Sequence, residues 1–343
     1  MSREVTLRDV AAKADVSYQT VSKVLNNKGN FSPDTKARIW SAIEELNYRP
    51  NISARNLRTL SSNLIGYGWL QADSVAPHPV LDAFLYSTVY NFEKAGYHLL
   101  TFLVADCEDT GIYQSLFHQR QVEGFIMADT NDNDPRIAHM IKNKIPFVSF
   151  GRANDQWDFC WVDVDGICGL EKATTHLIKQ GHQRIALLTW PMGSKVGSHR
   201  EMGYFQALNQ SGISADSSWL VRGKNTVRAG VEGFNQLWSL PASRRPTAVV
   251  CVSDLIAIGV MNGAAAANLE VGQDIAVTGY DDTPMAEFLH PPLTSVRQPI
   301  PEVGQHVVNL LLKQINGDEI AEKGILLSPE LIVRASSQTT LSG

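Results

Sequence analysis

Long apolar segments and paired cysteines are both missing from this sequence. Among its 343 residues no run of about 18 apolar side chains occurs, so no segment is expected to cross a membrane. The four cysteines are scattered without a C-x-x-C pair, which predicts reduced thiols and no zinc site. The N-terminus carries charges where a secretory signal needs an apolar core, so the expected location is cytoplasmic.

Motifs that mark enzymes and nucleotide binders are also missing. Gly66-Tyr67-Gly68 opens like a dinucleotide-binding fingerprint, but Gln71 stands where the next glycine is required. Neither G-x-x-x-x-G-K-[ST] nor G-x-S-x-G occurs. We therefore expect no catalytic residue, no resident metal and no cofactor. An α/β carbohydrate-processing enzyme is still an alternative, and its carboxylates would be chosen from Asp163, Asp165, Asp281 and Asp282.

Charge is unevenly distributed along the chain. The whole sequence has 30 Lys and Arg against 35 Asp and Glu, a net charge of −5. Residues 1–60 alone hold ten basic and six acidic residues, a net of +4, so the remainder carries −9. A modestly basic head on an acidic body favours a protein whose head meets phosphates while its body is kept away from them.

Residues 5–25 have the pattern of two short helices joined by a tight turn. Thr6 and Asp9 have the spacing of a capping box, and Asp15 falls at the turn, where Asp tolerates a positive φ. Ser17 is expected to cap the second helix. The apolar residues at helical spacing, which predict the buried faces of the pair, are Leu7, Val10, Ala11, Ala14, Val21, Val24 and Leu25.

The outward face of the second helix carries hydrogen-bonding groups and one full charge, which suits the reading of base edges in a major groove. An ordinary helical hairpin with a solvated polar face is the alternative that the spacing alone leaves open. The residues of this head that we expect to contact DNA are Thr6, Ser17, Tyr18, Gln19, Thr20, Ser22, Lys23 and Asn26.

A third helix and a short segment complete the first 60 residues. Ser32 followed by Pro33 is a typical helix start, and the apolar stripe that follows predicts a three-helix domain over residues 1–48. Tyr48-Arg49-Pro50 is expected to end the third helix, because proline disfavours helical geometry in the residue before it. Residues 49–60 are too few to form a stable helix alone, so something they touch must order them.

Beyond residue 61, strand-like apolar runs alternate with helical stretches. This order is typical of a parallel, doubly wound α/β fold, here in two halves, with ligands at the carboxyl ends of the strands. The expected strands are 64–69, 97–104, 124–128, 147–150, 161–164, 184–189, 248–252 and 275–280, and the helices between them include 80–94, 166–180, 198–210 and 254–267.

Two stretches of the first 60 residues carry a family signature. They are Leu7-x-Asp9-Val10-Ala11-x-x-Ala14-x-Val16-Ser17-x-x-Thr20-Val21-Ser22-x-Val24-Leu25-Asn26 and Asn47-Tyr48-Arg49-Pro50-Asn51-x-x-Ala54-Arg55-x-Leu57. Together they closely resemble the headpiece and hinge helix of the lac repressor and gal repressor family of bacterial transcription regulators. Asp15 replaces the family's usual glycine, and Lys23 its commoner arginine. The resemblance implies a hinge helix at 49–60 whose DNA contacts are Asn51, Ala54, Arg55 and Leu57, the last wedged into the minor groove.

The rest of the chain resembles that family's effector domain, which is itself similar to periplasmic sugar-binding proteins. The matching stretches are 95–97, 162–165, 176–186, 253–259, 277–282 and 291–296. The resemblance implies an effector-binding and dimerisation domain over 61–343, with one lobe at about 61–163 and 294–326 and the other at about 164–293 and 327–343. The chain would cross between the lobes near Asp163, Thr294 and Leu327, with the ligand in the cleft.

Two side chains stand out for that cleft. Arg200 and Asp281 align with the pocket arginine and aspartate of the family, and a guanidinium fork beside a carboxylate suits vicinal hydroxyl groups. A surface ion pair is the alternative for these two residues. Trp190 or Trp161 would supply an aromatic face for a sugar ring, although a buried Trp more often belongs to the core. The further residues expected at the pocket wall are Asp254, which would also cap the helix that begins there, Ser253, Arg152, Trp190, Val80 and Leu81.

The resemblance implies a ligand-responsive regulator of transcription, most simply a repressor of carbohydrate-utilisation genes in the bacterial cytoplasm, associated with the nucleoid through its operator. Its expected partners are a pseudo-palindromic double-stranded operator, a small carbohydrate and a second copy of itself. A dimer is favoured because the last residues lack the apolar heptads of a tetramerisation tail. A pure solute-binding protein is a further alternative, but such a protein does not need the basic head.

Overall fold

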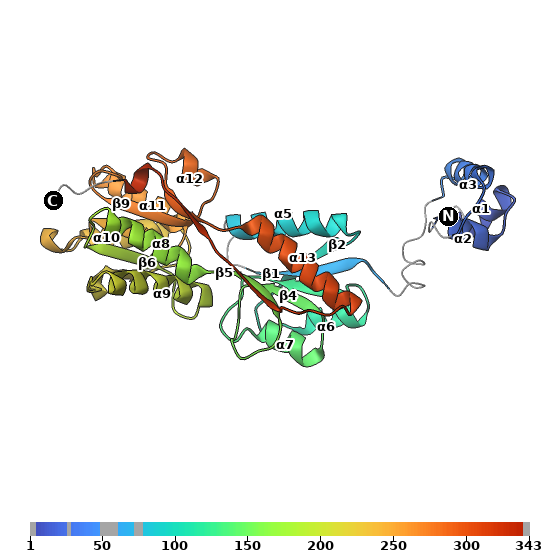
Figure 1. Cartoon of the computed structure of the whole chain (residues 1–343), viewed down its shortest axis with the longest axis horizontal. Helices are drawn as coiled ribbons and strands as arrows, with labels where there is room; N and C mark the ends of the chain where they lie inside the picture. Colours follow the sequence, from blue (N-terminus) through green and yellow to red (C-terminus); the bar gives the residue numbers. More distant parts are fainter. Residues whose placement is uncertain (1–4, 26–28, 49–60, 72–77, 339–343) are drawn as a thin grey trace. The chain divides into compact units, whose positions relative to one another are not determined.

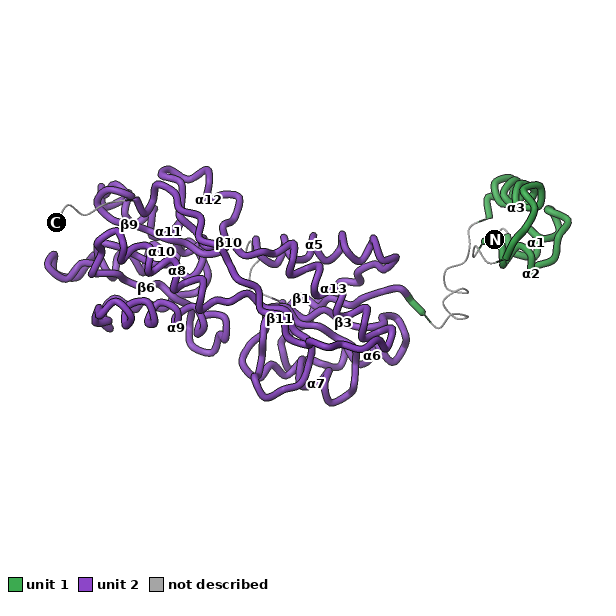
Figure 2. Tube along the Cα trace, in the orientation of Figure 1, with its two compact units in different colours: residues 1–62 green, residues 63–343 purple. Residues whose placement is uncertain are grey.

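The computed structural model describes residues 5–25, 29–48, 61–71 and 78–338. The chain divides into two compact units, residues 1–62 and residues 63–343 (Figure 2). The expected hinge helix at 49–60 lies outside the described residues, and so do the expected DNA contacts Asn26, Asn51, Ala54, Arg55 and Leu57.

Unit 1 is a three-helix domain, as the sequence predicts. Its helices are α1 (Leu7–Lys13), α2 (Tyr18–Leu25) and α3 (Pro33–Glu45). They enclose one small apolar core, because the stripes read from the sequence face one another. The buried members of that core are Val10, Ala11, Ala14, Val21, Val24, Ile39 and Ala42.

Local hydrogen bonds begin and end these helices. The Thr6 backbone N–H donates to Asp9 Oδ2 at 2.8 Å, and its hydroxyl donates to the same oxygen at 2.6 Å. Asp15 has a φ of 50°, which confirms the expected turn between α1 and α2. The Ser17 hydroxyl accepts from the Thr20 N–H at 3.1 Å and caps α2.

The end of α3 corrects an expectation. The helix stops at Glu45, before the expected end at 48–50. Asn47 adopts a φ of 47°, and the Tyr48 N–H donates back to the Ile43 carbonyl at 2.9 Å. A left-handed residue with such a bond terminates a helix by itself, so the proline at position 50 is not needed to stop it.

Unit 2 consists of two α/β lobes (Figure 1). The first lobe is built on a six-stranded sheet with the order β11-β5-β4-β3-β1-β2, and the second on a sheet with the order β12-β10-β9-β8-β6-β7. The strands of the first sheet are β1 (Leu64–Leu70), β2 (His98–Val104), β3 (Gly124–Met127), β4 (Phe147–Phe150), β5 (Cys160–Val164) and β11 (Gly324–Leu327). The strands of the second are β6 (Ile185–Thr189), β7 (Leu220–Arg222), β8 (Ala248–Cys251), β9 (Ala276–Asp281), β10 (Thr294–Arg297) and β12 (Glu330–Ile332).

Helices cover these sheets. Those of the first lobe are α5 (Pro79–Lys94), α6 (Gly111–His118), α7 (Pro135–Asn143) and α13 (Ile300–Asn316), and those of the second are α8 (Gly166–Lys179), α9 (Lys195–Gln210), α10 (Val227–Trp238), α11 (Asp254–Ala266) and α12 (Met285–Phe288). Three short 3₁₀ turns occupy 217–219, 242–244 and 335–337. Among the described residues no helix has the length and apolar character needed to span a bilayer.

The lobes share a strand order but differ at one edge. All the paired strands of the first sheet run parallel, including β11 beside β5. In the second sheet β12 runs antiparallel to β10, with Ser295 opposite Ile332. The predicted parallel, doubly wound fold is confirmed in both lobes, and only the three-residue edge strand β12 departs from the parallel direction. The chain leaves the second lobe at the end of β10 and re-enters it at β12, so the two strands run in opposite directions.

Three segments join the lobes. They follow β5, β10 and β11, as the strand memberships show. The second crossing is later than expected: β10 pairs with β9 from Thr294 to Arg297, so the connection lies at residues 298–299. The sequence could not show this, because a strand of four residues is too short to carry a clear period.

Close helix packing depends on glycine in the second lobe. A Cβ on Gly203 of α9 would overlap the Ile167 carbonyl oxygen of α8. On α10 and α11 the same holds for Gly230, which would overlap the Ile256 carbonyl oxygen. The contact at Gly203 brings α9 close against α8, and this packing fixes the position of the first turns of α9.

Candidate functional site

A cavity of about 310 Å³ lies between the lobes of unit 2. It is formed where strands end: Asp129 and Gly151 follow β3 and β4 of the first lobe, and Trp190 follows β6 of the second. Ligands of doubly wound folds bind at this edge of the sheet. Of the eight residues expected at the pocket wall, five line the cavity: Val80, Leu81, Trp190, Arg200 and Asp281.

Arg200 is held firmly from the second lobe. Its side chain is buried, and Nη1 donates to the Val252 carbonyl and lies 3.5 Å from Asp281 Oδ1. The guanidinium carbon lies 3.6 Å from the centre of the Tyr280 ring and 5.0 Å from that of Trp190. The Nε atom has no partner among the described residues. The guanidinium is thus oriented in advance, with one donor uncommitted.

Asp281 closes the floor of the cavity at the end of β9. Its φ of 113° is a strained conformation for a residue with a side chain, and such strain often accompanies function. Gln298 Nε2 donates to its Oδ1 at 2.8 Å. Burial raises the pKa of the Asp281 carboxyl to about 7, and the opposing charge of Arg200 does not cancel this effect.

Asp254 is a second buried carboxyl, behind the first. Burial raises its pKa to about 6. It does not cap α11 as expected: the Ser253 hydroxyl does so by accepting from the Ile256 N–H at 3.3 Å. The Asp254 carboxylate instead accepts from the Ser295 hydroxyl at 2.6 Å and the Thr283 N–H at 2.7 Å. Neither Asp254 nor Ser253 lines the cavity, so both act behind it.

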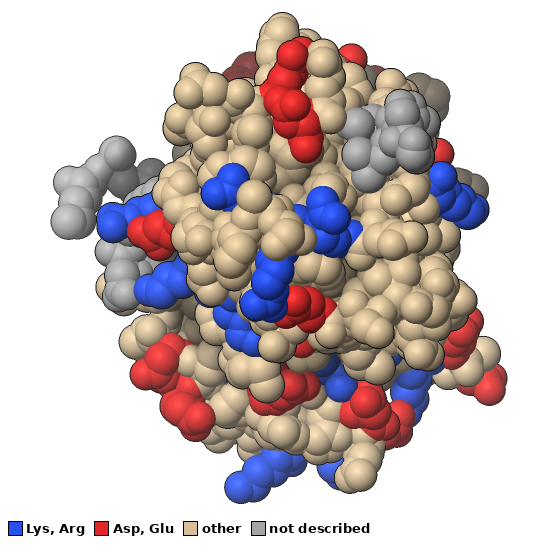
Figure 3. Space-filling view, turned by 90° about the vertical axis from the view of Figure 1, so that its left-hand side faces the viewer, with Lys and Arg blue, Asp and Glu red and all other residues tan. Residues whose placement is uncertain are grey.

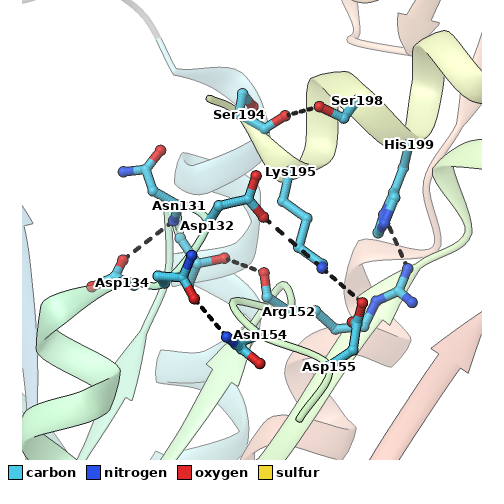
Figure 4. Close-up of polar contacts among 12 residues, drawn as sticks. Asn131, Asp132, Asp134, Arg152, Asn154, Asp155, Ser194, Lys195, Ser198 and His199 are labelled. Atoms are coloured by element: carbon cyan, nitrogen blue, oxygen red, sulfur yellow. Dashed lines mark hydrogen bonds and ion pairs between the residues drawn. The ribbon is translucent and has the colours of Figure 1, made fainter. Parts of the chain in front are cut away.

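Arg152 also stands outside the cavity lining. Its Nε donates to Asp163 Oδ2 at 2.9 Å, and its Nη2 lies 3.1 Å from His199 Nδ1 (Figure 4). The guanidinium carbon lies 5.4 Å from the centre of the Trp161 ring, which is therefore occupied by Arg152. The expected place of Arg152 in the wall is wrong, because partners within the protein take up its donors.

Several lining residues were missed by the sequence analysis. They are polar groups, all but one of them on loops that follow strand ends; the exception is His199, which lies on α9. The set includes Asp129, Thr130, Asn131, His199, Asn225 and Gln298. Asn225 accepts a hydrogen bond from the Ser253 hydroxyl at 2.6 Å, which ties the loop after β7 to the start of α11. Their one sequence signal is position: Asp129 is two residues past β3 and Asn225 three past β7.

The polar face of α2 is the candidate DNA contact surface of unit 1. Tyr18 is 46% exposed, Gln19 and Lys23 are exposed, and Ser22 is half-buried. Thr20 is half-buried, and its hydroxyl lies 2.8 Å from that of Ser17. The face thus offers amide, phenol and hydroxyl groups with one cation, as major-groove reading requires.

Positive and negative side chains are interspersed on the face of unit 2 that Figure 3 shows. On the face in Figure 3, Lys and Arg side chains lie among Asp and Glu and among uncharged residues. Among the paired groups of the second lobe are Arg222 with Glu201 at 2.7 Å and Arg244 with Asp216 at 2.8 Å. The face in view therefore lacks the continuous basic patch that is typical of a nucleic-acid-binding surface.

Comparison with known protein families covers both units. Residues 6–51 match the model of bacterial regulatory proteins of the lacI family, and residues 174–337 match a periplasmic binding protein-like domain. The HTH-type transcriptional repressor CytR of Escherichia coli strain K12 is 30% identical over 338 residues, which are 97% of this chain and 96% of that protein.

Solved structures match almost the whole chain. A lac repressor dimer bound to operator and the anti-inducer ONPF is 29% identical, with a TM-score of 0.86, over 98% of this chain and all of that one. A complex of the transcriptional regulator CelR with cellobiose is 28% identical, with a TM-score of 0.74, over 97% of this chain and all of that one.

These matches decide between the alternatives that the sequence left open. Relatives that correspond from end to end are transcriptional repressors and regulators, which sets aside an enzyme and a pure solute-binding protein. The chain belongs to the lacI family of bacterial regulatory proteins, and it is a ligand-responsive, DNA-binding transcriptional repressor.

Proposed function

We propose that a small neutral carbohydrate, or a close polyol relative, binds between the lobes and controls operator affinity by changing the angle between them. The observation that carries this proposal is Arg200 beside Asp281 at the cavity floor. A guanidinium donates in a fixed fork and a carboxylate accepts, so together they match adjacent hydroxyl groups. The cellobiose held by CelR supports the same ligand class for this cavity.

The charge balance around the cavity favours a neutral ligand. Asp129, Asp163 and Asp281 line it, whereas Arg200 supplies the only guanidinium among the described lining residues. Arg152 stands outside the lining, and its charge is offset by Asp163 at 2.9 Å. A sugar phosphate would therefore meet more negative than positive charge and would leave its phosphate poorly paired.

The ligand class is tested on the protein–operator complex. An operator-bound sample is titrated with neutral sugars, sugar phosphates and purine nucleosides, and the bound fraction is followed by gel shift. We expect neutral sugars alone to change operator affinity, by the roughly five- to 150-fold that allosteric coupling usually supplies. A response only to purines or to sugar phosphates would refute the assignment.

We also propose that the regulator acts as a homodimer on a pseudo-palindromic operator that controls carbohydrate-utilisation genes, in the bacterial cytoplasm at the nucleoid. One head reads only a half-site, and two-fold symmetric operators match two-fold symmetric proteins. The operator-bound lac repressor dimer supports this arrangement. Footprinting combined with sedimentation tests it: a monomer that protects a single asymmetric half-site at nanomolar concentration would contradict it.

The proposed base-reading residues lie at the start of α2. Tyr18 and Gln19 are exposed on its first turn, and Lys23 is the nearby cation for a phosphate. Replacing Gln19 with Ala is expected to cost about 1–3 kcal/mol of operator binding and to relax preference at one base position. Binding to operator and to random DNA is compared; an equal loss on both would show that Gln19 does not read sequence.

A further inference from the structure

Two polar bridges cross the cleft beside the cavity (Figure 4). Lys195 Nζ of the second lobe lies 3.1 Å from Asp155 Oδ2 and 3.9 Å from Asp132 Oδ1, both in the first lobe. Arg152 Nη2 of the first lobe lies 3.1 Å from His199 Nδ1 of the second. Lys195 and its two carboxylate partners all stand outside the cavity lining, so this bridge joins the lobes without occupying the ligand's place. The second bridge ends on His199, which belongs to the lining, although Arg152 does not.

Lys195 is in an unfavourable place for its own helix. It is the first residue of α9, directly after the Ser194 cap. A positive charge in the first turn opposes the helix dipole, so the stability of α9 does not account for a lysine there. Its side chain is only 12% exposed, whereas those of Asp155 and Asp132 are 71% and 45% exposed. The two carboxylates across the cleft are the partners that offset the unfavourable placement.

The second bridge is aimed from within the first lobe. Asp163 of β5 accepts from Arg152 Nε at 2.9 Å and fixes the guanidinium. Burial, and then the charge of Arg152, lowers the pKa of His199, which favours the neutral ring. Its Nδ1 then accepts from Arg152 Nη2, because a guanidinium can only donate. The two bridges together connect the first two turns of α9 to the loops that follow β3 and β4.

We propose that Lys195, assisted by Arg152, is a positioning residue that holds the two lobes closed, and so sets the population of the ligand-binding conformation without touching the ligand. Interfaces between two lobes joined by short crossings are mobile by default, so a few such contacts can shift the balance. The consequence for ligand affinity rests on the proposed function, because apparent affinity scales with the fraction of competent protein. Closure itself is measured without any ligand.

The test is an interlobe distance measured by double electron–electron resonance on the full chain. Spin labels are placed at Gln121→Cys in the first lobe and Gln236→Cys in the second, both exposed positions. The background carries Cys107→Ser and Cys168→Ser, since the other two cysteines are buried. Labelled protein is diluted into an excess of unlabelled protein so that each assembly holds one labelled chain.

Charge removal and its matched control separate the bridge from general effects. We expect wild type to populate the short distance, and Lys195→Gln to lower the ratio of closed to open by about fivefold. Lys179 is an exposed lysine of α8 that makes no ion pair or side-chain hydrogen bond among the described residues, so Lys179→Gln should keep the wild-type distribution. Wild-type distances in Lys195→Gln would overturn the proposal.

A charge swap separates loss of the bridge from unfolding of α9. Lys195→Glu should open the cleft further, although it favours the dipole of α9 and so does not weaken that helix. Adding Asp155→Lys should restore closure by reversing the pair; a double variant as open as the single one would contradict the bridge. Failure of wild type to bind any sugar would count against the proposed function alone, because the distance measurements would stand.

Discussion

Each lobe of unit 2 buries one arginine beside an aspartate, and the two pairs differ in what they leave unused. In the first lobe, Arg136 binds Asp134 through two bonds of 3.0 and 2.7 Å, and its Nη2 also donates to the Asp129 carbonyl at 2.8 Å. In the second, Arg200 and Asp281 approach only to 3.5 Å, and the Arg200 Nε has no partner among the described residues.

The difference indicates a division of labour between the lobes. We call Arg136 with Asp134 the closed pair, because its hydrogen bonds are complete. Arg136 donates to the carbonyls just after β3, where Asp129 joins the cavity lining. We call Arg200 with Asp281 the open pair, and both of its residues line the cavity. A fully bonded pair has nothing to offer a ligand, whereas an incomplete pair gains its missing hydrogen bonds when a ligand arrives.

Breaking the closed pair should have the largest effect on stability. Asp134→Ala leaves Arg136 buried and unpaired and removes the cap of α7, so we expect a loss of about 3–5 kcal/mol in the free energy of unfolding. Urea denaturation followed by circular dichroism measures it. As a control, Asp158→Ala removes an exposed pair with Lys323 and should cost under about 1 kcal/mol. Equal losses in the two variants would erase the distinction.

The open pair should reveal itself through pH. The Asp281 carboxyl has a raised pKa, about 7 in the folded protein, so the unfolded chain releases this proton first as pH rises. Its contribution to stability is present below about pH 4 and is lost as pH rises through 7, an effect on the order of 4 kcal/mol. Asp281→Asn should therefore flatten the decline of unfolding free energy between pH 4 and 7. Parallel profiles for variant and wild type would show that Asp281 does not titrate in this range.

Shortening an apolar side chain of the first lobe should have the smallest effect on sugar binding. Val80 lines the cavity and is half-buried, so Val80→Ala removes little contact area and should weaken sugar binding by about fivefold, or about 1 kcal/mol. Operator binding without ligand should not change. A loss as large as that from a change at Arg200 would mean that the first lobe, not the second, anchors the ligand.

How much of this was readable in the sequence depends on the range of the contacts. The caps at Ser17 and Ser32 and the turn at Asp15 involve neighbours within a few residues, and each was predicted correctly. The body's longer strands were predicted because buried parallel strands are continuous apolar runs. The edge strands β7, β11 and β12 were missed, since three or four residues in partly exposed positions carry no clear period.

The cavity shows the limit of the same reasoning. Arg200 and Asp281 were assigned through the family resemblance, whereas Asn225 and Asp129 come from loops that only the folded sheet brings together. Arg152 was placed in the wall through the same resemblance, but its partners Asp163 and His199 lie 11 and 47 residues away. The sequence shows which residues are close to a side chain along the chain. Which side chains pair across the two lobes depends on how the three crossing segments place the lobes.

The central claim is that the open Arg200–Asp281 pair binds the effector, and titration calorimetry of wild type and Arg200→Ala against a sugar panel tests it most directly. Arg228→Ala, an exposed arginine on α10, is the matched control. We expect one neutral sugar to bind wild type and the control equally, and to bind Arg200→Ala at least about a hundredfold more weakly, or about 2.7 kcal/mol, while operator binding is retained. Unchanged sugar affinity in Arg200→Ala would contradict the account.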